Sequence, residues 1–222
     1  MVDKLETSTD RRPPLTKERV LRAAVDLADR EGIDSLSMRR LGQGLGVDAM
    51  ALYRHVRNKD EILDGIVEAI VGEISLPDSN GDWKAALRAQ VMVARQVMLR
   101  HPWAPKVIEE RPAVSPTMLG YIESVLAKLA DGGFSIDMAH HAIHVLGSRI
   151  LGFNQDLFED SADPAPSPEA AAAVARALAA YPHVTELAQS VSHDGVLGAC
   201  DDDFEFAFGL DLILDGLERR RA

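Results

Sequence analysis

Apolar residues recur along this chain mainly at intervals of three and four positions. That spacing places them on one side of an α-helix, whereas a half-buried β-strand would alternate strictly, and no such alternation occurs. The pattern predicts an all-α protein. We expect helices over residues 16–31, two short ones within 37–57, and further helices over 58–76, 82–100, 103–109, 115–132, 135–158, 169–180, 183–191 and 202–220.

The stretch SMRRLGQGLGVDAMALYRHVRNK, residues 37–59, has the pattern of a helix-turn-helix. Ser37 and Asp48 are suited to cap its two helices, and Gly46 can adopt the left-handed conformation that ends the first. A small shared core is expected from Leu41, Leu45, Val47, Leu52 and Val56. Asn58 is the expected cap of the following helix, with a glutamate three residues later close to a capping box.

Composition shifts divide the chain into three predicted parts. These are a flexible arm over 1–15, a helix-turn-helix domain over 16–60 and a larger domain over 61–222 that begins with a connector helix at 61–76. Turn residues predict a hinge at 77–82, and an acidic, proline-rich run predicts a mobile loop at 159–168. The arm either has no role or touches DNA phosphates or the minor groove through Arg11 and Arg12.

Charge is distributed unevenly. The whole chain has a net charge of −11, but residues 1–60 carry 12 Lys and Arg against 10 Asp and Glu, so the acidic excess lies in the remainder. A polyanion would therefore be tolerated only by the first quarter of the chain, which excludes a wrapped, purely electrostatic nucleic-acid binder. Cys200 is the single cysteine, so an intrachain disulfide and a cysteine-rich zinc site are excluded.

The start of the chain is polar and no apolar run reaches the roughly 20 residues of a membrane span, so we expect a cytoplasmic protein with no membrane partner. The glycines of GQGLG suggest a dinucleotide site, but they are spaced G-x-G-x-G and no apolar β-run precedes them. We therefore do not expect a nucleotide cofactor there.

The order of helix-turn-helix, connector, hinge and larger helical body, together with AVDLADREGIDSLSMRRLGQGLGVDAMALYRHVRNKDEIL, resembles the TetR family of transcription regulators. The resemblance implies a homodimeric, non-enzymatic repressor that binds a palindromic DNA operator. By position, Arg39 would contact guanine, and Ala49 and Met50 would contact base edges such as a thymine methyl. The implied phosphate contacts are Ser37, Tyr53, His55 and Lys59. The alternative is that these side chains form an ordinary solvated surface.

The resemblance also implies a dimer through the last two long helices. The predicted contacts there are Phe204, Phe208, Leu212 and Ile213, although the phenylalanines could instead fill the core of their own chain. The body resembles the sensor domain of the tetracycline repressor more loosely, through Asp82-Trp83, Arg111-Pro112 and residues 132–135. Where that repressor has a drug-chelating histidine, this chain reads Val107-Ile108-Glu109. We therefore expect a different, largely apolar small-molecule inducer and no other cofactor.

The predicted ligand-binding residues combine apolar side chains with three polar ones that can orient a ligand. They are Val91, Arg95, Met98, Trp103, Met118, Ile122, His144, Ser148 and Leu151.

Two alternatives to this function remain. The first is a metal-dependent helical enzyme or metal sensor that uses His140, His141 and His144, because His140 and His144 share one helical face. Two such ligands do not complete a four-coordinate zinc site, so we predict no metal. The second is a dimeric helical adaptor without DNA binding, which the apolar Ala49 and Met50 would suit.

Overall fold

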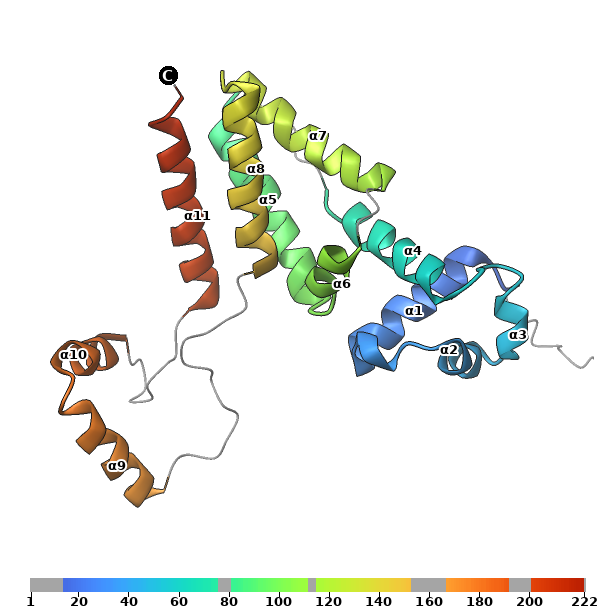
Figure 1. The fold of residues 1–222 in the computed structure, drawn as a ribbon, viewed down its shortest axis with the longest axis horizontal. Coiled ribbons are helices and arrows are strands. Elements are labelled where there is room, and N and C mark those ends of the chain that lie inside the picture. The colour runs from blue at the N-terminus through green and yellow to red at the C-terminus, as the bar shows by residue number, and fades with distance from the viewer. Residues whose placement is uncertain (1–13, 76–80, 112–114, 153–166, 192–200, 222) are drawn as a thin grey trace, which may run out of the picture. The chain divides into compact units, whose positions relative to one another are not determined.

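A computed structural model describes residues 14–75, 81–111, 115–152, 167–191 and 201–221 (Figure 1). Every regular element in those ranges is a helix, which confirms the predicted all-α class. The elements are α1 (Lys17–Glu31), a 3-10 turn η1 (Ile33–Ser35), α2 (Met38–Leu45), α3 (Ala49–Leu52), α4 (Lys59–Gly72), α5 (Trp83–Arg100), α6 (Ala104–Glu110), α7 (Pro116–Asp131), α8 (Ile136–Gly152), α9 (Pro168–Leu178), α10 (Pro182–Val191) and α11 (Asp202–Glu218).

Some predictions lie outside the described residues. These are the arm up to residue 13, the hinge at 77–80, the last part of the helix predicted to reach residue 158, the loop at 159–166, and Cys200. None of the helices within the described ranges combines the length and the apolar character needed to cross a membrane.

Local side-chain chemistry starts the helices where the sequence predicts. The side chain of Ser37 accepts a hydrogen bond from the Arg40 amide at 3.3 Å, and that of Asn58 accepts one from the Glu61 amide at 2.8 Å. The other predicted caps, Asp48, Asp82, Ser115 and Ser135, likewise accept from amides of the first helical turn. One detail differs from the prediction, because the Glu61 carboxylate accepts from the Arg57 amide rather than from the Asn58 amide of a true capping box.

The helices form two compact units. The first consists of Met1–Leu76 and Val93–Ser124, and the second of Pro77–Met92 and Val125–Ala222. In the first unit, α1 contacts α2 and α4, α2 contacts α3, and α4 contacts α6. Its core is the apolar side of α1 and α4 together with one or two residues from each short helix. The fully buried members include Val20, Ala24, Leu52, Val56, Ile62, Ile66 and Ile70.

The second unit contains the first half of α5, the last half of α7, and α8 to α11. Aromatic packing joins the start of α5 to the segment before α8, because the rings of Trp83 and Phe134 meet edge to face with centroids 4.7 Å apart. Gly132 permits this contact, since a Cβ there would lie 2.7 Å from the Trp83 ring. Helix α11 lies beside α8 (Figure 1) and buries Phe206, Leu210, Leu214 and Leu217.

Candidate nucleic-acid interface

The turn between α2 and α3 has one tight geometry. Gly46 has φ 67° and ψ 35°, the left-handed conformation that glycine adopts without strain. The Val47 amide donates to the Gly42 carbonyl at 2.9 Å, which brings the two helices close together. A Cβ on Gly42 would lie 2.9 Å from the Val47 carbonyl oxygen and 3.1 Å from the Ala49 nitrogen. The angle between α2 and α3 therefore depends on glycine at two positions.

Packing separates the core of this motif from its surface. Leu41, Leu52 and Val56 are buried as predicted, whereas Leu45 and Val47 are only half-buried. On the outer side, Met50 is 70% exposed and Tyr53 is 46% exposed. The structure therefore presents the leading turn of α3 and its end to solvent.

The remaining predicted DNA contacts are also accessible. Arg39 and Lys59 are exposed, and Ser37, Ala49 and His55 are half-buried. The hydroxyl oxygen of Ser37 accepts from the Arg40 amide as the cap of α2, which leaves its O–H group to donate elsewhere. Arg54, which follows Tyr53 in the chain, is exposed as well and was missed by the sequence analysis. Its positive charge, between the predicted phosphate contacts Tyr53 and His55, is a sequence signal that could have made it a candidate.

The basic side chains near this surface differ in whether they form an ion pair within the chain. Arg40 forms an ion pair with Glu31, and Arg57 forms one with Glu61 at 3.0 Å. Among the described residues, neither Arg39 nor Lys59 has a hydrogen-bonding or ion-pair partner. Arg39 and Lys59 are thus free to bind an external anion without breaking an internal bond.

Glu61 ties three segments together beneath this surface. Its carboxylate accepts from Lys17 Nζ at 2.6 Å and from the amide and Nε of Arg57 at 2.9 and 3.0 Å. The hydrogen bond from Lys17 and those from Arg57 lower the pKa of Glu61 from 4.5 to about 2. Helix α1, the segment after α3 and the first turn of α4 are therefore joined by one ionised carboxylate.

A second cluster joins α1 to the segment that follows α5. Buried His101 places Nδ1 2.8 Å from Asp29 Oδ1 and Nε2 3.4 Å from Glu73 Oε2. The indole N–H of Trp103 donates to the same Asp29 oxygen at 2.6 Å. Burial opposes ionisation of Glu73, but hydrogen bonds from Arg100 and His101 still lower its pKa. Trp103, a predicted ligand-binding residue, therefore has its polar atom bound to α1.

The other predicted ligand-binding residues vary in exposure. Val91, Arg95 and Met98 are buried, and Met118, Ile122 and Leu151 are half-buried. His144 and Ser148 are exposed, and the Ser148 hydroxyl donates to the His144 carbonyl at 2.8 Å. Four of the nine belong to the second unit and the other five to the first, so their convergence on one pocket stays a prediction; the four are Val91, His144, Ser148 and Leu151.

The histidines of α8 do not form a metal centre with their surroundings. His140, His141 and His144 are exposed, and the His140 ring centroid lies 4.6 Å from that of His144 and 5.5 Å from that of His141. In the part of the chain that the structure describes, no three His, Cys, Asp or Glu side chains gather closely enough to hold an ion. The metal-dependent enzyme or metal sensor is therefore not supported.

The predicted dimer contacts on α11 face solvent. Phe204 is 62% exposed, Phe208 is 53% exposed and Leu212 is 54% exposed, while Ile213 is half-buried. The rings of Phe204 and Phe208 stack with centroids 6.3 Å apart. The core position in this part of the helix belongs to Phe206 instead. The alternative that Phe204 and Phe208 fill the core of their own chain is therefore wrong.

Comparisons with known proteins cover both units. Residues 20–66 match the family model described as bacterial regulatory proteins, tetR family, and residues 76–221 match the tetracyclin repressor-like C-terminal domain. An HTH-type transcriptional regulator of Saccharopolyspora erythraea is 40% identical over 58% of this chain and 55% of its own length, so the chain spans about half of that relative.

Two further relatives extend along almost the whole chain. The HTH-type transcriptional repressor DrrR1 of Streptomyces coeruleorubidus is 32% identical over 93% of this chain and 78% of its own length. The crystal structure of the Streptomyces coelicolor TetR family protein ActR in complex with (S)-DNPA is 27% identical and has a TM-score of 0.69, covering 95% of this chain and 100% of that one.

Proposed function

Because this chain belongs to the TetR family of bacterial transcriptional regulators, we propose that it is a homodimeric repressor that binds a palindromic operator and is released by a small molecule. It is a DNA-binding regulator with an N-terminal helix-turn-helix and a C-terminal helical domain. Neither the family nor the site calls for a catalytic step. A regulator of this kind acts on cytoplasmic DNA, and we place the protein there.

The observation that carries the DNA-binding proposal is the contrast between Arg39 and Arg40. Both lie in the first turn of α2, but Arg40 is held by Glu31 and Arg39 has no partner among the described residues. A free guanidinium at this position can donate to O6 and N7 of guanine together, which a single ammonium group cannot do with the same geometry. Arg39 is therefore the base-reading residue in this proposal.

The other contacts divide into base and backbone groups. Ala49 and Met50, on the leading turn of α3, pack against base edges such as a thymine methyl. Tyr53 and Lys59, with Ser37 and His55, bind phosphates and fix the orientation of α3 in the major groove. The exposed guanidinium of Arg54 is an additional phosphate contact in this proposal.

Dimerisation is proposed through α8 and α11. The α11 stripe, which we define as Phe204, Phe208 and Leu212, is apolar and more than half exposed. Beside it, an apolar groove of about 450 Å³ runs between α8 and α11 and includes Val145 and Ile213 in its walls. A second copy would cover both surfaces and present two reading helices about 34–36 Å apart, one turn of DNA.

The effector proposal rests on the family and on its liganded relative. ActR was crystallised with (S)-DNPA, which supports a small organic molecule as the effector of this chain. The predicted lining residues remain the candidate site, with buried Val91, Arg95 and Met98 the first to test. We also retain the proposed organisation of an arm at 1–15, a DNA-binding domain at 16–60 and a sensor domain at 61–222 with its connector at 61–76.

Selection of bound sequences from random duplexes tests the proposal, with Arg39→Ala and Arg40→Ala as a matched pair. We expect wild type to select a near-palindrome. Arg39→Ala should weaken binding to it by about 1–3 kcal/mol and relax one base pair of each half-site. Arg40→Ala, which removes only an exposed ion pair, should change stability by about 0–1 kcal/mol and leave the selected sequence unchanged. Equal effects of the two substitutions, or equal loss on random DNA, would refute base reading by Arg39.

A further inference from the structure

Helix α11 presents different chemistry on each of its sides. Phe206, Leu210, Leu214 and Leu217 are buried, and the α11 stripe is exposed. A third set is acidic and follows the same helical repeat, with Asp211, Asp215 and Glu218 spaced four and three residues apart. These carboxylates lie on the flank of α11 that faces α5, as their bonds to α5 show.

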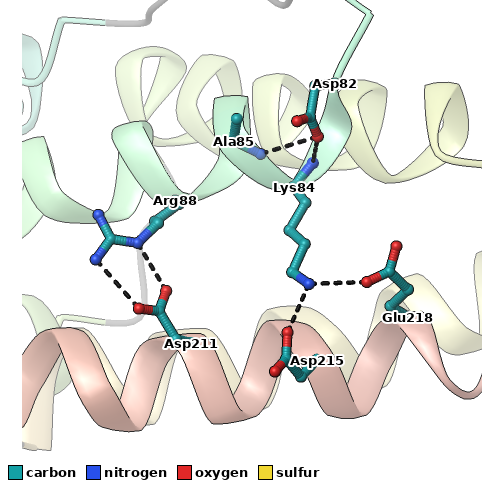
Figure 2. A network of polar contacts seen from close by, with 7 residues as sticks. All are labelled: Asp82, Lys84, Ala85, Arg88, Asp211, Asp215 and Glu218. Atoms are coloured by element: carbon teal, nitrogen blue, oxygen red, sulfur yellow. Dashed lines mark hydrogen bonds and ion pairs between the residues drawn. The ribbon is translucent and has the colours of Figure 1, made fainter.

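The acidic flank is matched by two cations one turn apart on α5 (Figure 2). Arg88 donates from Nε to Asp211 Oδ1 at 2.7 Å and from Nη2 to Asp211 Oδ2 at 3.2 Å. Lys84 Nζ donates to Asp215 at 2.5 Å and to Glu218 at 2.8 Å. Because the lower number on α5 pairs with the higher numbers on α11, the two helices run antiparallel. We call these four bonds the α5–α11 ladder.

Lys84 and Asp215 stabilise the charged form of each other. The hydrogen bond to Asp215, and to a smaller extent the one to Glu218, raises the pKa of Lys84 to about 12. The same hydrogen bond lowers the pKa of Asp215. Two-point contact between Arg88 and one carboxylate also restricts direction, because both N–H groups of a planar fork must be aligned at once.

A different helix marks the other flank of α11. Arg149 of α8 donates from Nη2 to the Glu205 carbonyl at 2.6 Å, and its guanidinium carbon lies 4.9 Å from the Phe206 ring centroid. The guanidinium lies against Gly209, where a Cβ would come within 2.7 Å of Nη2. A residue with a side chain at 209 would displace the arginine from this position.

Apolar packing by itself opposes a one-turn shift of α11 in only one direction, in which Glu218 and Arg221 would come to the positions of Leu214 and Leu217. It specifies the axial position weakly against a shift in the opposite direction. If the helix moved by one turn, about 5.4 Å, residues 206, 210 and 213 would replace 210, 214 and 217, and three of the four buried positions would remain apolar. In that position Ala207 would face Arg88 in place of Asp211, and Leu214 would face Lys84 in place of Glu218. Lys84 would keep one carboxylate, because Asp211 would replace Asp215. Glu205 would replace Gly209 and occupy the space of Arg149. The polar contacts therefore distinguish two axial positions of α11 that apolar burial barely distinguishes.

We propose that Lys84, Arg88 and Arg149 are positioning residues that fix the axial register of α11, and with it the height at which the α11 stripe meets a second copy. The dimer part of this inference rests on the proposed function. A one-turn shift would move the stripe by a full turn, so the spacing of the two DNA-reading helices in the proposed dimer would depend on contacts made within one chain. Charge complementarity sets the register, and apolar burial holds the helix in place.

Charge exchange across the ladder tests the proposal in the full-length chain. The variants are Arg88→Glu, Asp211→Arg and their combination, with Lys106→Glu as control because Lys106 and Asp34 form an exposed pair at 3.8 Å in the other unit. Hydrogen exchange of the 201–218 peptide reports α11 in each protomer. Sedimentation reports the dimer, and selection from duplexes with variable spacers reports the half-site spacing.

We expect each single substitution, Arg88→Glu or Asp211→Arg, to make the amide hydrogens of α11 exchange faster. Each should also raise the dimer dissociation constant about tenfold or change the preferred half-site spacing. The combination should restore wild-type values, and the control should match wild type. Unchanged single variants, or a combination as impaired as the singles, would overturn the register assignment. A wild type that is monomeric would refute the homodimeric repressor instead, and the exchange data would still decide the register within the protomer.

The α8 flank has its own test. Arg149→Ala and Gly209→Ala remove the same contact, so we expect the combined variant to show α11 exchange no faster than the faster single variant. Additive increases would show that the two residues act separately, which would remove Arg149 from the positioning set.

Discussion

The exposure of Phe208 leads to a quantitative prediction about the dimer. Its ring is 53% exposed in the single chain, although phenylalanine ordinarily prefers the interior. A phenylalanine buries about 200 Å² when fully covered, so about 100 Å² remains to be covered by a second copy. At about 25 cal/mol per Å², this area corresponds to about 2.5 kcal/mol for each protomer.

Phe208→Ser removes this contribution from both copies. The dimer then loses about 5 kcal/mol if all of the remaining area is covered, and about 2.5 kcal/mol if only half is. The smaller figure already raises the dimer dissociation constant at least about 50-fold. Sedimentation velocity over a dilution series measures this constant, and thermal unfolding of the diluted monomer shows whether the fold is intact.

Two comparison variants make the result specific. Met50→Ser removes an apolar side chain that is 70% exposed on α3, so it should leave the dimer constant unchanged. Phe206→Ser changes a ring that is only 1% exposed, and it should destabilise the protomer itself by about 3–5 kcal/mol. The reasoning fails if Phe208→Ser dimerises as tightly as wild type, or if it lowers the melting temperature of the monomer as much as Phe206→Ser does.

Two further predictions concern the helix-turn-helix and its support. Gly42→Ala should cost about 1–3 kcal/mol of stability by pushing α2 and α3 apart, and it should weaken operator binding. Gly44→Ala should be neutral or stabilising, because a Cβ there meets no atom within 4 Å. Thermal melting and operator-binding curves compare the two variants. Because the folded-state pKa of Glu61 lies below its ordinary value, at about 2, its contribution to stability is complete above about pH 4.5 and is lost as the pH falls toward 2. Urea unfolding from pH 7 to 2.5 should therefore show wild type more stable than Glu61→Gln at neutral pH, with the difference shrinking in acid; a difference independent of pH would contradict this assignment.

The sequence by itself determined the helices, their starts and the identity of the reading motif. The caps Ser37, Asn58 and Asp82 accept from amides two or three residues away, so the donor and the acceptor both lie in one short stretch of sequence. The glycine at 46 is equally local, since its conformation serves the turn in which it lies. The sequence also placed Phe204 and Phe208 on one face of the last helix.

The tertiary structure decided which of these side chains are free to act. Arg39 and Arg40 look alike in the sequence, and only the position of Glu31 on another helix shows that one of them is already bound. Likewise, the indole of Trp103 is held by Asp29, 74 residues away, and the acidic side of α11 is matched by cations more than 120 residues earlier. Periodicity specifies which face of a helix is apolar, but it contains no information about which distant charge meets that face. Those pairs form only when packing brings the helices together, and they separate the residues that support the fold from those left available to bind.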